Sequence, residues 1–382
     1  MIGGGFMGKA HSNAWLKVNK FFDTDYDVCL KVIVGKKSPL EAFAKRWGYE
    51  EVSYDWEETV SRADIDIVDI GTPTFEHMEM AVAAAKAGKH IVCEKPCALT
   101  YGQCLKMAKE AKKAGVVTYL NHNYRRVPAV AYAKQLVEDG RLGTIFHWQG
   151  AYFQDWIMDP DFPLTWHLQS KYAGGGPLFD LSSHAYDLAR FIIGNAQAVT
   201  AVNKTFVKER PLPGAGAATF SAGAKDDKAQ KAAVDVDDAS FAVVEFENGA
   251  LGSIQTTRFA TGRKNYNDFE IYGSKGALKF NFESMNELYF LDATQPQAEQ
   301  GFRRILCTEG VHPYVSAWWP AGHIIGYEHT FVNGFYDFLQ AIAGKGLPLK
   351  PDFNDGADII RFAEAVKLSS EAHRRVLIEE IK

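Results

Sequence analysis

Asp180 and His184 lie four residues apart, and Asp187 follows three residues later. On a helix these three side chains share one stripe. A carboxylate one turn from an imidazole can orient the ring and raise its proton affinity, which is what acid–base catalysis requires. The same spacing also fits an aspartate that caps a helix and a buried histidine that takes no part in chemistry. The residues alone leave both interpretations open.

Lys95 is a second candidate for chemistry, because it lies where a strand is expected to end. The apolar run 90–93 leads into Glu94, Lys95 and Pro96, and the proline lacks an N–H and stops the strand. In a doubly wound sheet, ligands bind at the carboxyl ends of the strands. We therefore expect Glu94 and Lys95 beside a ligand, although a lysine at this place also fits an ordinary surface residue.

Three glycines near the start of the sequence, Gly3, Gly5 and Gly8, fit the spacing G-x-G-x-x-G. Such glycines allow a tight turn, let the backbone approach a pyrophosphate, and direct a helix N-terminus at that charge. Helical residues follow, as the motif requires, but only two residues precede it, whereas a strand needs about five. We expect that the chain as given has lost the start of its first strand.

The end of the second strand leaves the type of dinucleotide open. In NAD-binding domains an acidic residue at this place binds the ribose hydroxyls. This sequence has Lys36, Lys37 and Ser38 there instead. Two lysines and a serine suit the 2′-phosphate of NADP, but lysines at a turn are also typical of a solvated surface. The sequence predicts NAD or NADP and does not decide between them.

The elements that must position these residues change in type along the chain. Over 1–122, short apolar runs such as 28–34 and 90–93 alternate with helical segments such as 76–86, which is typical of βαβ units and a doubly wound parallel sheet. Beyond about residue 145, strands follow one another through Gly-containing turns, which indicates an antiparallel sheet. The segment 212–233 is expected to be a long surface loop. The predicted class is α/β: an N-terminal Rossmann domain over 1–122, then an α+β domain over 123–382 with an open, mostly antiparallel sheet. The C-terminal helices can pack back on the first domain.

Composition excludes several other classes of protein. The 382 residues suit two domains, and 42 Lys+Arg against 47 Asp+Glu give a formal charge of −5, which argues against a nucleic-acid binder. No apolar stretch is long enough to cross a membrane, and no leader pattern is found at the N-terminus. The five scattered cysteines predict neither a disulfide framework nor a metal site. We expect a cytoplasmic protein.

Taken together, five segments resemble one family. GGGFMGKAH, GTPTFEH, GKHIVCEKP, LNHNYRRVPAV and AGGGPLFDLSSHAYDLARFIIG are similar, in order and spacing, to the glucose–fructose oxidoreductase / inositol dehydrogenase / MocA family. The resemblance covers essentially the whole chain. It implies hydride transfer between NAD(P) and a secondary hydroxyl of a sugar or cyclitol, and a homodimer or homotetramer formed through the open sheet.

The resemblance also implies roles for residues. The catalytic set that it implies is Lys95, Asp180 and His184. The expected cofactor contacts are Gly3, Gly5, Phe6, Met7, Gly8, Lys36, Lys37, Ser38, Thr72, Pro73, His77, Glu94, Lys95 and Asn123. Either Lys95 or His184 takes the proton from the hydroxyl, and the sequence does not say which.

Two further segments, AYFQDW and PLTWHLQSKYAGGG, resemble the branch of levoglucosan dehydrogenase-like pyranoside dehydrogenases more than the inositol branch. This implies oxidation at C3 of a pyranoside, with inositol 2-dehydrogenation as an alternative. A glycosidase or lyase that oxidises C3 transiently with bound NAD also fits the family, as does a ligand sensor without catalysis. The candidate substrate contacts are Lys95, Tyr124, Arg125, Gln154, Trp156, Trp166, His167, Asp180 and His184. Amide, charged and aromatic groups of this kind suit a pyranose.

Overall fold

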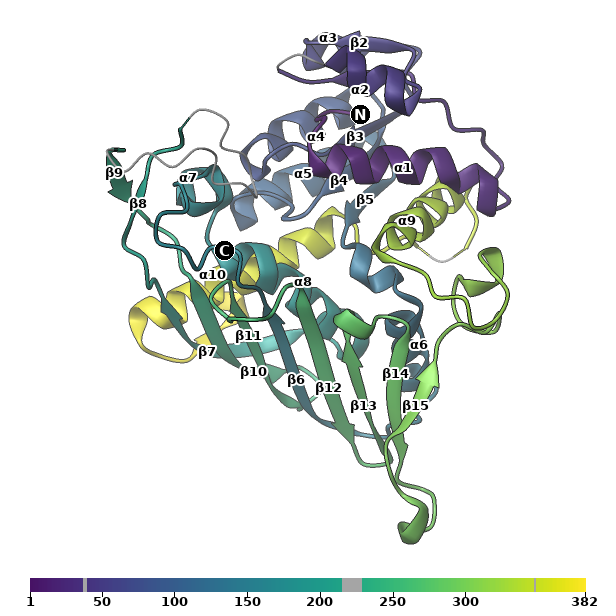
Figure 1. Ribbon diagram of the computed structural model, residues 1–382, viewed down its shortest axis with the longest axis vertical. Coiled ribbons are helices and arrows are strands. Elements are labelled where there is room, and N and C mark those ends of the chain that lie inside the picture. The colour runs from purple at the N-terminus through teal and green to yellow at the C-terminus, as the bar shows by residue number, and fades with distance from the viewer. Residues whose placement is uncertain (37–39, 215–228, 347) are drawn as a thin grey trace. The chain divides into compact units, whose positions relative to one another are not determined.

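The chain forms two compact units, which are described separately (Figure 1). The computed structural model describes all residues except 37–39, 215–228 and 347. The first unit contains Met1–Val127 and Thr308–Asp358, and the second contains Pro128–Cys307 and Ile359–Lys382. The first unit thus includes a segment from late in the chain, to which helix α9 (Tyr327–Ile342) belongs. The division into 1–122 and 123–382 stays a sequence-based prediction.

The first unit has a parallel sheet, as predicted for a Rossmann domain. β1 pairs with β2, and β3, β4 and β5 pair in that order, all parallel. Ile2 makes parallel bridges to Val34 and Ile70, so this residue joins the two groups of strands. The strands are β1 (Val32–Val34), β2 (Glu51–Ser53), β3 (Ile67–Ile70), β4 (His90–Glu94) and β5 (Thr118–Asn121).

Ile2 and Met1 stand in the place of a central strand. The Ile2 N–H donates to the Asp69 carbonyl at 2.7 Å, and its carbonyl accepts from the Gly71 N–H at 2.9 Å. A cavity of about 490 Å³ is lined by Met1, by the chain leading to β1 and by the start of β3. The Met1 ammonium donates to the Val32 carbonyl at 3.0 Å, and burial lowers its pKa.

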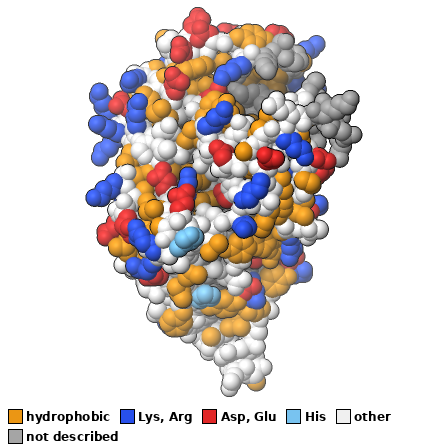
Figure 2. Space-filling model, turned by 90° about the vertical axis from the view of Figure 1, so that its left-hand side faces the viewer, with side chains coloured by type: hydrophobic (Ala, Val, Ile, Leu, Met, Phe, Trp, Pro, Cys, Tyr) orange, Lys and Arg blue, Asp and Glu red, His pale blue; other side chains and the backbone are white. Residues whose placement is uncertain are grey.

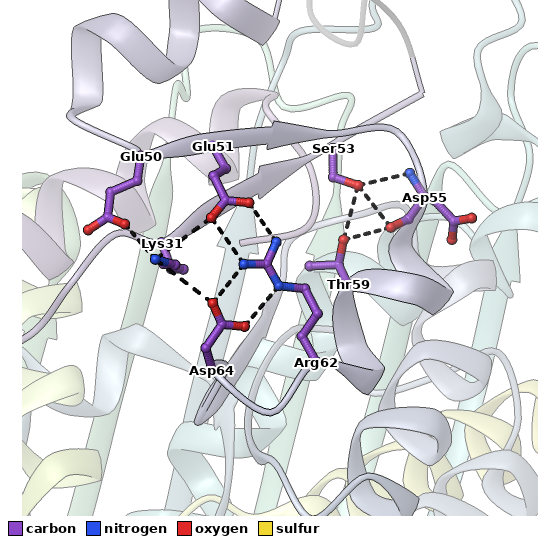
Figure 3. A network of polar contacts seen from close by, with 8 residues as sticks. All are labelled: Lys31, Glu50, Glu51, Ser53, Asp55, Thr59, Arg62 and Asp64. Atoms are coloured by element: carbon purple, nitrogen blue, oxygen red, sulfur yellow. Dashed lines mark hydrogen bonds and ion pairs between the residues drawn. The ribbon is translucent and has the colours of Figure 1, made fainter.

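A polar network that includes Lys31, Arg62 and Asp64 lies beside this cavity (Figure 3). Arg62 donates to Glu51 at 2.6 Å and to Asp64 at 2.7 Å, and Lys31 donates to Glu50 at 2.7 Å. The hydrogen bond from Arg62 lowers the pKa of Asp64 to about 2. The network therefore ties β2 to the turn before β3, and Lys31 and Asp64 also line the cavity.

Helices connect the strands of the first unit, which is the reason that successive strands run parallel. Helices α1 and α9 share an aromatic core in which Trp15, Phe335 and Phe338 are buried. The helices are α1 (Phe6–Phe21), α2 (Leu40–Trp47), α3 (Trp56–Ser61), α4 (His77–Lys86), α5 (Tyr101–Ala114) and α9, with short 3₁₀ turns at Thr74–Glu76, Asn123–Arg126 and Val315–Ala317.

The second unit contains a nine-stranded sheet in the order β15-β14-β13-β12-β6-β11-β10-β7-β16. Every neighbouring pair is antiparallel except β6 and β11, so the predicted open, mostly antiparallel sheet is confirmed. The strands are β6 (Ile145–Phe153), β7 (Ala196–Lys204), β10 (Ala239–Phe246), β11 (Leu251–Thr257), β12 (Tyr266–Gly273), β13 (Gly276–Asn281), β14 (Glu287–Asp292), β15 (Arg303–Leu306) and β16 (Val376–Leu377).

Helix α8 (Pro177–Ile193) packs against β6, β10 and β11 and carries the candidate residues Asp180 and His184. Its apolar positions Leu181, Leu188 and Ile192 are buried, which anchors the helix. The other helices are α6 (Pro128–Glu138), α7 (Ser170–Ala173) and the part of α10 (Phe353–Ala372) from Ile359 onward, since α10 begins in the first unit. The 3₁₀ turns of the second unit are at Trp166–Leu168, Phe282–Ser284, Gln297–Glu299 and Ile378–Glu380.

The loop expected over 212–233 falls mostly on 215–228, outside the described residues. Beside that stretch, β8 (Glu209–Pro211) pairs antiparallel with β9 (Lys231–Ala233). In the part of the chain that the structure describes, no helix has the length and apolar character needed to cross a membrane.

Candidate active site

The glycine turn before α1 has the shape that a dinucleotide requires. Gly3 has φ +106°, and a Cβ there would lie 2.7 Å from the Gly71 carbonyl oxygen. A Cβ on Gly8 would lie 2.1 Å from the Gly3 carbonyl oxygen, so a side chain at either position would displace backbone. A Cβ on Gly5 would meet nothing within 4 Å, and this residue therefore faces open space.

The N-terminus of α1 suits an anion. Gly5 is its N-cap and offers no side-chain hydrogen bond, and the first turn has no acidic residue. The first amides of a helix lack partners within the helix and carry the positive end of its dipole. Phe6, the first helical residue, is exposed and Met7 is half-buried. The turn and the helix together fit the pyrophosphate of a dinucleotide.

Lys36 follows β1 at the place where the type of dinucleotide is decided. Its ammonium pairs with the carboxylate of Glu76, and its side chain is largely exposed. Lys37 and Ser38, the other two residues of this prediction, lie outside the described residues. The choice between NAD and NADP stays open.

His77 links the turns that follow β3 and β4. Its Nδ1 is 3.0 Å from the Pro96 carbonyl oxygen, and its Nε2 is 2.9 Å from the carbonyl oxygen of Thr72, the residue before Pro73. Burial lowers the pKa of His77, which favours the neutral ring that donates to one of these carbonyls at a time. His77 therefore fixes two segments predicted to contact cofactor. Its own contact with cofactor stays a prediction.

The carboxylate of Glu94 is buried and accepts hydrogen bonds from three groups of the first unit. Oε1 accepts from Asn121 Nδ2 at 2.5 Å and from His11 Nε2 at 2.8 Å, and Oε2 accepts from the backbone N–H of Lys95 at 3.2 Å. Glu94 is buried, while Lys95 is partly exposed at the end of β4. The carboxylate therefore holds the peptide that carries Lys95.

The residues after β5 are buried against the first unit's own helix α9. The side-chain amide of Asn123 donates to Thr330 Oγ1 at 2.9 Å. The Tyr124 ring lies 6.4 Å from that of Tyr327, and Arg125 is also buried. The predicted contact of Asn123 with cofactor, and of Tyr124 and Arg125 with substrate, stays a prediction.

In the second unit, Asp180 and His184 lie one turn apart on α8. Asp180 Oδ2 accepts from Arg258 Nη2 at 2.6 Å, and the Arg258 side chain is only 1% exposed. The helix is not capped by Asp180, because Asp237 accepts from the Gly176 and Leu178 N–H groups. His184 is buried, with its ring 5.9 Å from that of Tyr152.

Four of the candidate substrate residues come together in the second unit. Trp156 Nε1 donates to Gln154 Oε1 at 2.9 Å, and the Trp156 ring meets that of His167 edge-on at 6.1 Å. The rings of His167 and Trp166 are 3.6 Å apart. One amide and three aromatic rings therefore lie next to one another.

Arg258, Asp237, Asn265 and His11 are functional candidates that the sequence analysis did not single out. Asn265 accepts from Gln154 at 2.9 Å and from Tyr152 at 2.6 Å. Arg258 follows strand β11, where no motif marks it. His11 closes the segment GGGFMGKAH, so its spacing from Gly8 was a usable signal. Lys95 belongs to the first unit and Asp180 and His184 to the second, and their convergence stays a prediction.

The glycine turn and the parallel sheet are those of a dinucleotide-binding domain of the Rossmann type. Family models match the chain twice: an oxidoreductase family with an NAD-binding Rossmann fold over residues 1–122, and a GFO/IDH/MocA C-terminal domain over 130–279. The chain belongs to the GFO/IDH/MocA family of oxidoreductases.

Individual proteins are similar over the whole chain. Levoglucosan dehydrogenase from Pseudarthrobacter phenanthrenivorans is 40% identical, over 100% of this chain and 98% of that protein. The solved structure of an oxidoreductase domain protein from Kribbella flavida is 44% identical, with a TM-score of 0.92 over 99% of this chain and 97% of that one. Levoglucosan dehydrogenase in complex with NADH and levoglucosan has a TM-score of 0.91 at 40% identity, over 99% and 98% of the two chains.

Proposed function

We propose that this protein oxidises a secondary hydroxyl of a pyranoside, at C3 of a levoglucosan- or glucoside-like sugar. Bound NAD(P) would supply the hydride acceptor. The hydroxyl then loses its proton to the protein as the C–H bond loses its hydride, so a base within hydrogen-bond reach is required. Lys95 and His184 are the two candidates for this base, and the order in which they act is open.

One observation carries the proposal: the polar and aromatic surface of the second unit. Gln154, Trp156 and His167 present an amide and flat rings, which suit the hydroxyls and the apolar face of a pyranose. The Asp180–Arg258 pair belongs to the same unit. A carboxylate that pairs with a guanidinium can also accept hydrogen bonds from sugar hydroxyls and orient a neighbouring group.

Three competing functions are distinguished by what they predict. A cyclitol 2-dehydrogenase would use the same groups on an inositol. A glycosidase or lyase that oxidises C3 transiently would release product without net formation of NADH. A sensor would bind sugar and reduce nothing, and the presence of Lys95, Asp180 and His184 together argues against that function.

The test is a substrate panel with each cofactor. Purified protein is incubated with NAD, and separately with NADP, and with levoglucosan, methyl glucosides or inositols, while absorbance at the reduced nicotinamide band is recorded. We expect reduced cofactor to form in equal amount to oxidised pyranoside, with slower or no reaction of inositols. Product release without reduced cofactor would instead support the glycosidase or lyase. Binding without any reaction would support the sensor.

We also propose a cytoplasmic homodimer or homotetramer formed through the open sheet. Val202, Phe241, Val243 and Leu251 are exposed on the neighbouring strands β7, β10 and β11, and Phe241 pairs directly with Val202. Hydrophobic side chains also gather in patches on the lower part of the face drawn in Figure 2. Apolar side chains that are exposed together on neighbouring strands are typical of protein interfaces.

The assembly is tested by light scattering. Wild-type protein is expected to have twice or four times the mass of one chain. Val243→Glu places a charge on the apolar surface and is expected to yield monomers, while Lys86→Ala, on an exposed position of α4, leaves the mass unchanged. A wild-type monomer at micromolar concentration contradicts the proposal.

A further inference from the structure

An imidazole lies between two carboxylates in the interior of the first unit. His11 Nδ1 is 2.8 Å from Asp69 Oδ1, and its Nε2 is 2.8 Å from Glu94 Oε1. The three residues are 0%, 2% and 4% exposed, so water is excluded from both contacts. His11 comes from α1, Asp69 from β3 and Glu94 from the end of β4. The three residues therefore join the glycine-turn helix to two neighbouring strands.

The two carboxylates favour the cationic form of the ring. Each ring nitrogen faces a carboxylate oxygen, and both can donate only if the imidazole carries two protons. Burial disfavours that charge, but the charge and hydrogen bond of Asp69, followed by those of Glu94, outweigh burial and raise the pKa of His11 to about 10. The other groups around the ring are the Asn121 amide and the rings of Phe331 and Phe335.

The line of contacts continues to Lys95. Glu94 uses Oε1 for His11 and Asn121 and Oε2 for the backbone N–H of Lys95. The peptide that follows is held through the Pro96 carbonyl, which lies 3.0 Å from His77. The orientation of Lys95 at the strand end thus depends on a carboxylate that His11 holds.

We propose that His11 is a positioning residue for Lys95. The imidazolium fixes the Glu94 carboxylate, and the carboxylate fixes the backbone from which the Lys95 amine extends. The positive ring also offsets one of the two negative charges of the group, in which Glu94 interacts electrostatically with Lys95. The group of three then has a net charge of −1 rather than −2. The proposal rests on the proposed function, because it assigns Lys95 a proton-accepting role.

A purely structural histidine would predict something different. If His11 only fills the core against Phe331 and Phe335, its removal lowers stability and leaves the chemistry of Lys95 unchanged. If His11 positions Lys95, the charge of the His11 ring affects the reactivity of the Lys95 amine. His11→Gln changes the net charge of the group to −2, and Glu94→Gln changes it to 0, so the two variants must affect Lys95 in opposite directions.

The first readout is turnover against pH. In His11→Gln we expect kcat to fall roughly 10- to 100-fold, because small displacements of a reacting group cost rates of this order. The KM values change less, and the acid limb of the kcat profile moves to higher pH. In Glu94→Gln the acid limb moves to lower pH. Tyr49→Phe is the matched control. It removes a buried 2.9 Å hydrogen bond to Ser12, which lies on α1 beside His11, and is expected to leave the acid limb unchanged.

The second readout needs neither cofactor nor substrate. Acetylation of Lys95 by an amine-reactive ester is followed by mass spectrometry in the ligand-free protein at constant pH. We expect the rate to fall about threefold or more in His11→Gln and to rise in Glu94→Gln, relative to Tyr49→Phe. If no sugar is oxidised, the proposed function fails, and these rates still test the proposal. If His11→Gln does not fold, Glu94→Gln is compared with Tyr49→Phe alone.

Two results would overturn the proposal. One is equal acetylation rates in all folded variants. The other is a shift in the same direction for His11→Gln and Glu94→Gln, because packing, and not charge, would then explain both.

Discussion

Replacing Lys95 by alanine is expected to lower kcat for the oxidised sugar by roughly 10²–10⁴-fold, the range that a positioned acid or base contributes. Lys95 is partly exposed at the end of β4, and its backbone is held through Glu94. Loss of the amine therefore removes the proton acceptor while the backbone contacts that fix this turn persist. The melting temperature is expected to change little, because truncating a partly exposed side chain leaves the core intact.

The experiment separates chemistry from binding. NADH fluorescence and thermal melting are measured for Lys95→Ala, Lys95→Arg and the surface control Lys86→Ala, together with kcat and KM. Lys95→Arg keeps the positive charge but cannot give up its proton near neutral pH, so it is expected to be as slow as Lys95→Ala. Lys86→Ala is expected to match the wild type. Turnover within twofold of the wild type in Lys95→Ala would remove this residue from the reaction.

The sequence predicted the fold well where its signals were local. The helix expected over 76–86 is α4 (His77–Lys86), and the apolar run at 90–93 is β4 (His90–Glu94). The run at 28–34 was predicted too long: only Val32–Val34 form β1, because only these residues have partners in β2. A short strand without alternation, such as β2 (Glu51–Ser53), gives no periodic signal and was not predicted.

The candidate site was predictable in its residue types and not in its contacts. The spacing of Asp180 and His184 suggested that the carboxylate orients the imidazole, and this stays a prediction. The spacing gave no sign of the ion pair between Asp180 and Arg258, because Arg258 follows a strand far along the chain. In the same way, His11 meets Asp69 and Glu94 only because parallel strands end side by side. Local spacing carries no information about partners of this kind, since they are set by the order of strands in a sheet.

Replacing Arg258 by methionine is expected to give the second large effect. The Arg258 side chain is buried, pairs with Asp180 at 2.6 Å, and lies over the Trp156 ring with its guanidinium carbon 5.3 Å from the ring centroid. Its Nε and Nη1 have no hydrogen-bond partner among the described residues, so the pair with Asp180 is the main compensation for burying this charge. Removing Arg258 or Asp180 therefore leaves the remaining charge without this compensation. Breaking a buried pair costs about 3–5 kcal/mol, and the 26% exposure of the Asp180 side chain reduces this to about 2–3 kcal/mol.

A double-mutant cycle tests this expectation and separates stability from function. Urea unfolding is measured for Arg258→Met, Asp180→Asn and the double variant. The double variant is expected to regain much of the stability lost in Arg258→Met, because the group that lost its guanidinium is then a neutral amide. Turnover is expected to stay low in all three, since Asp180 is then either displaced or neutral. Additive losses of stability would show that the ion pair contributes nothing, and wild-type turnover in the double variant would show that the carboxylate is not needed for the reaction.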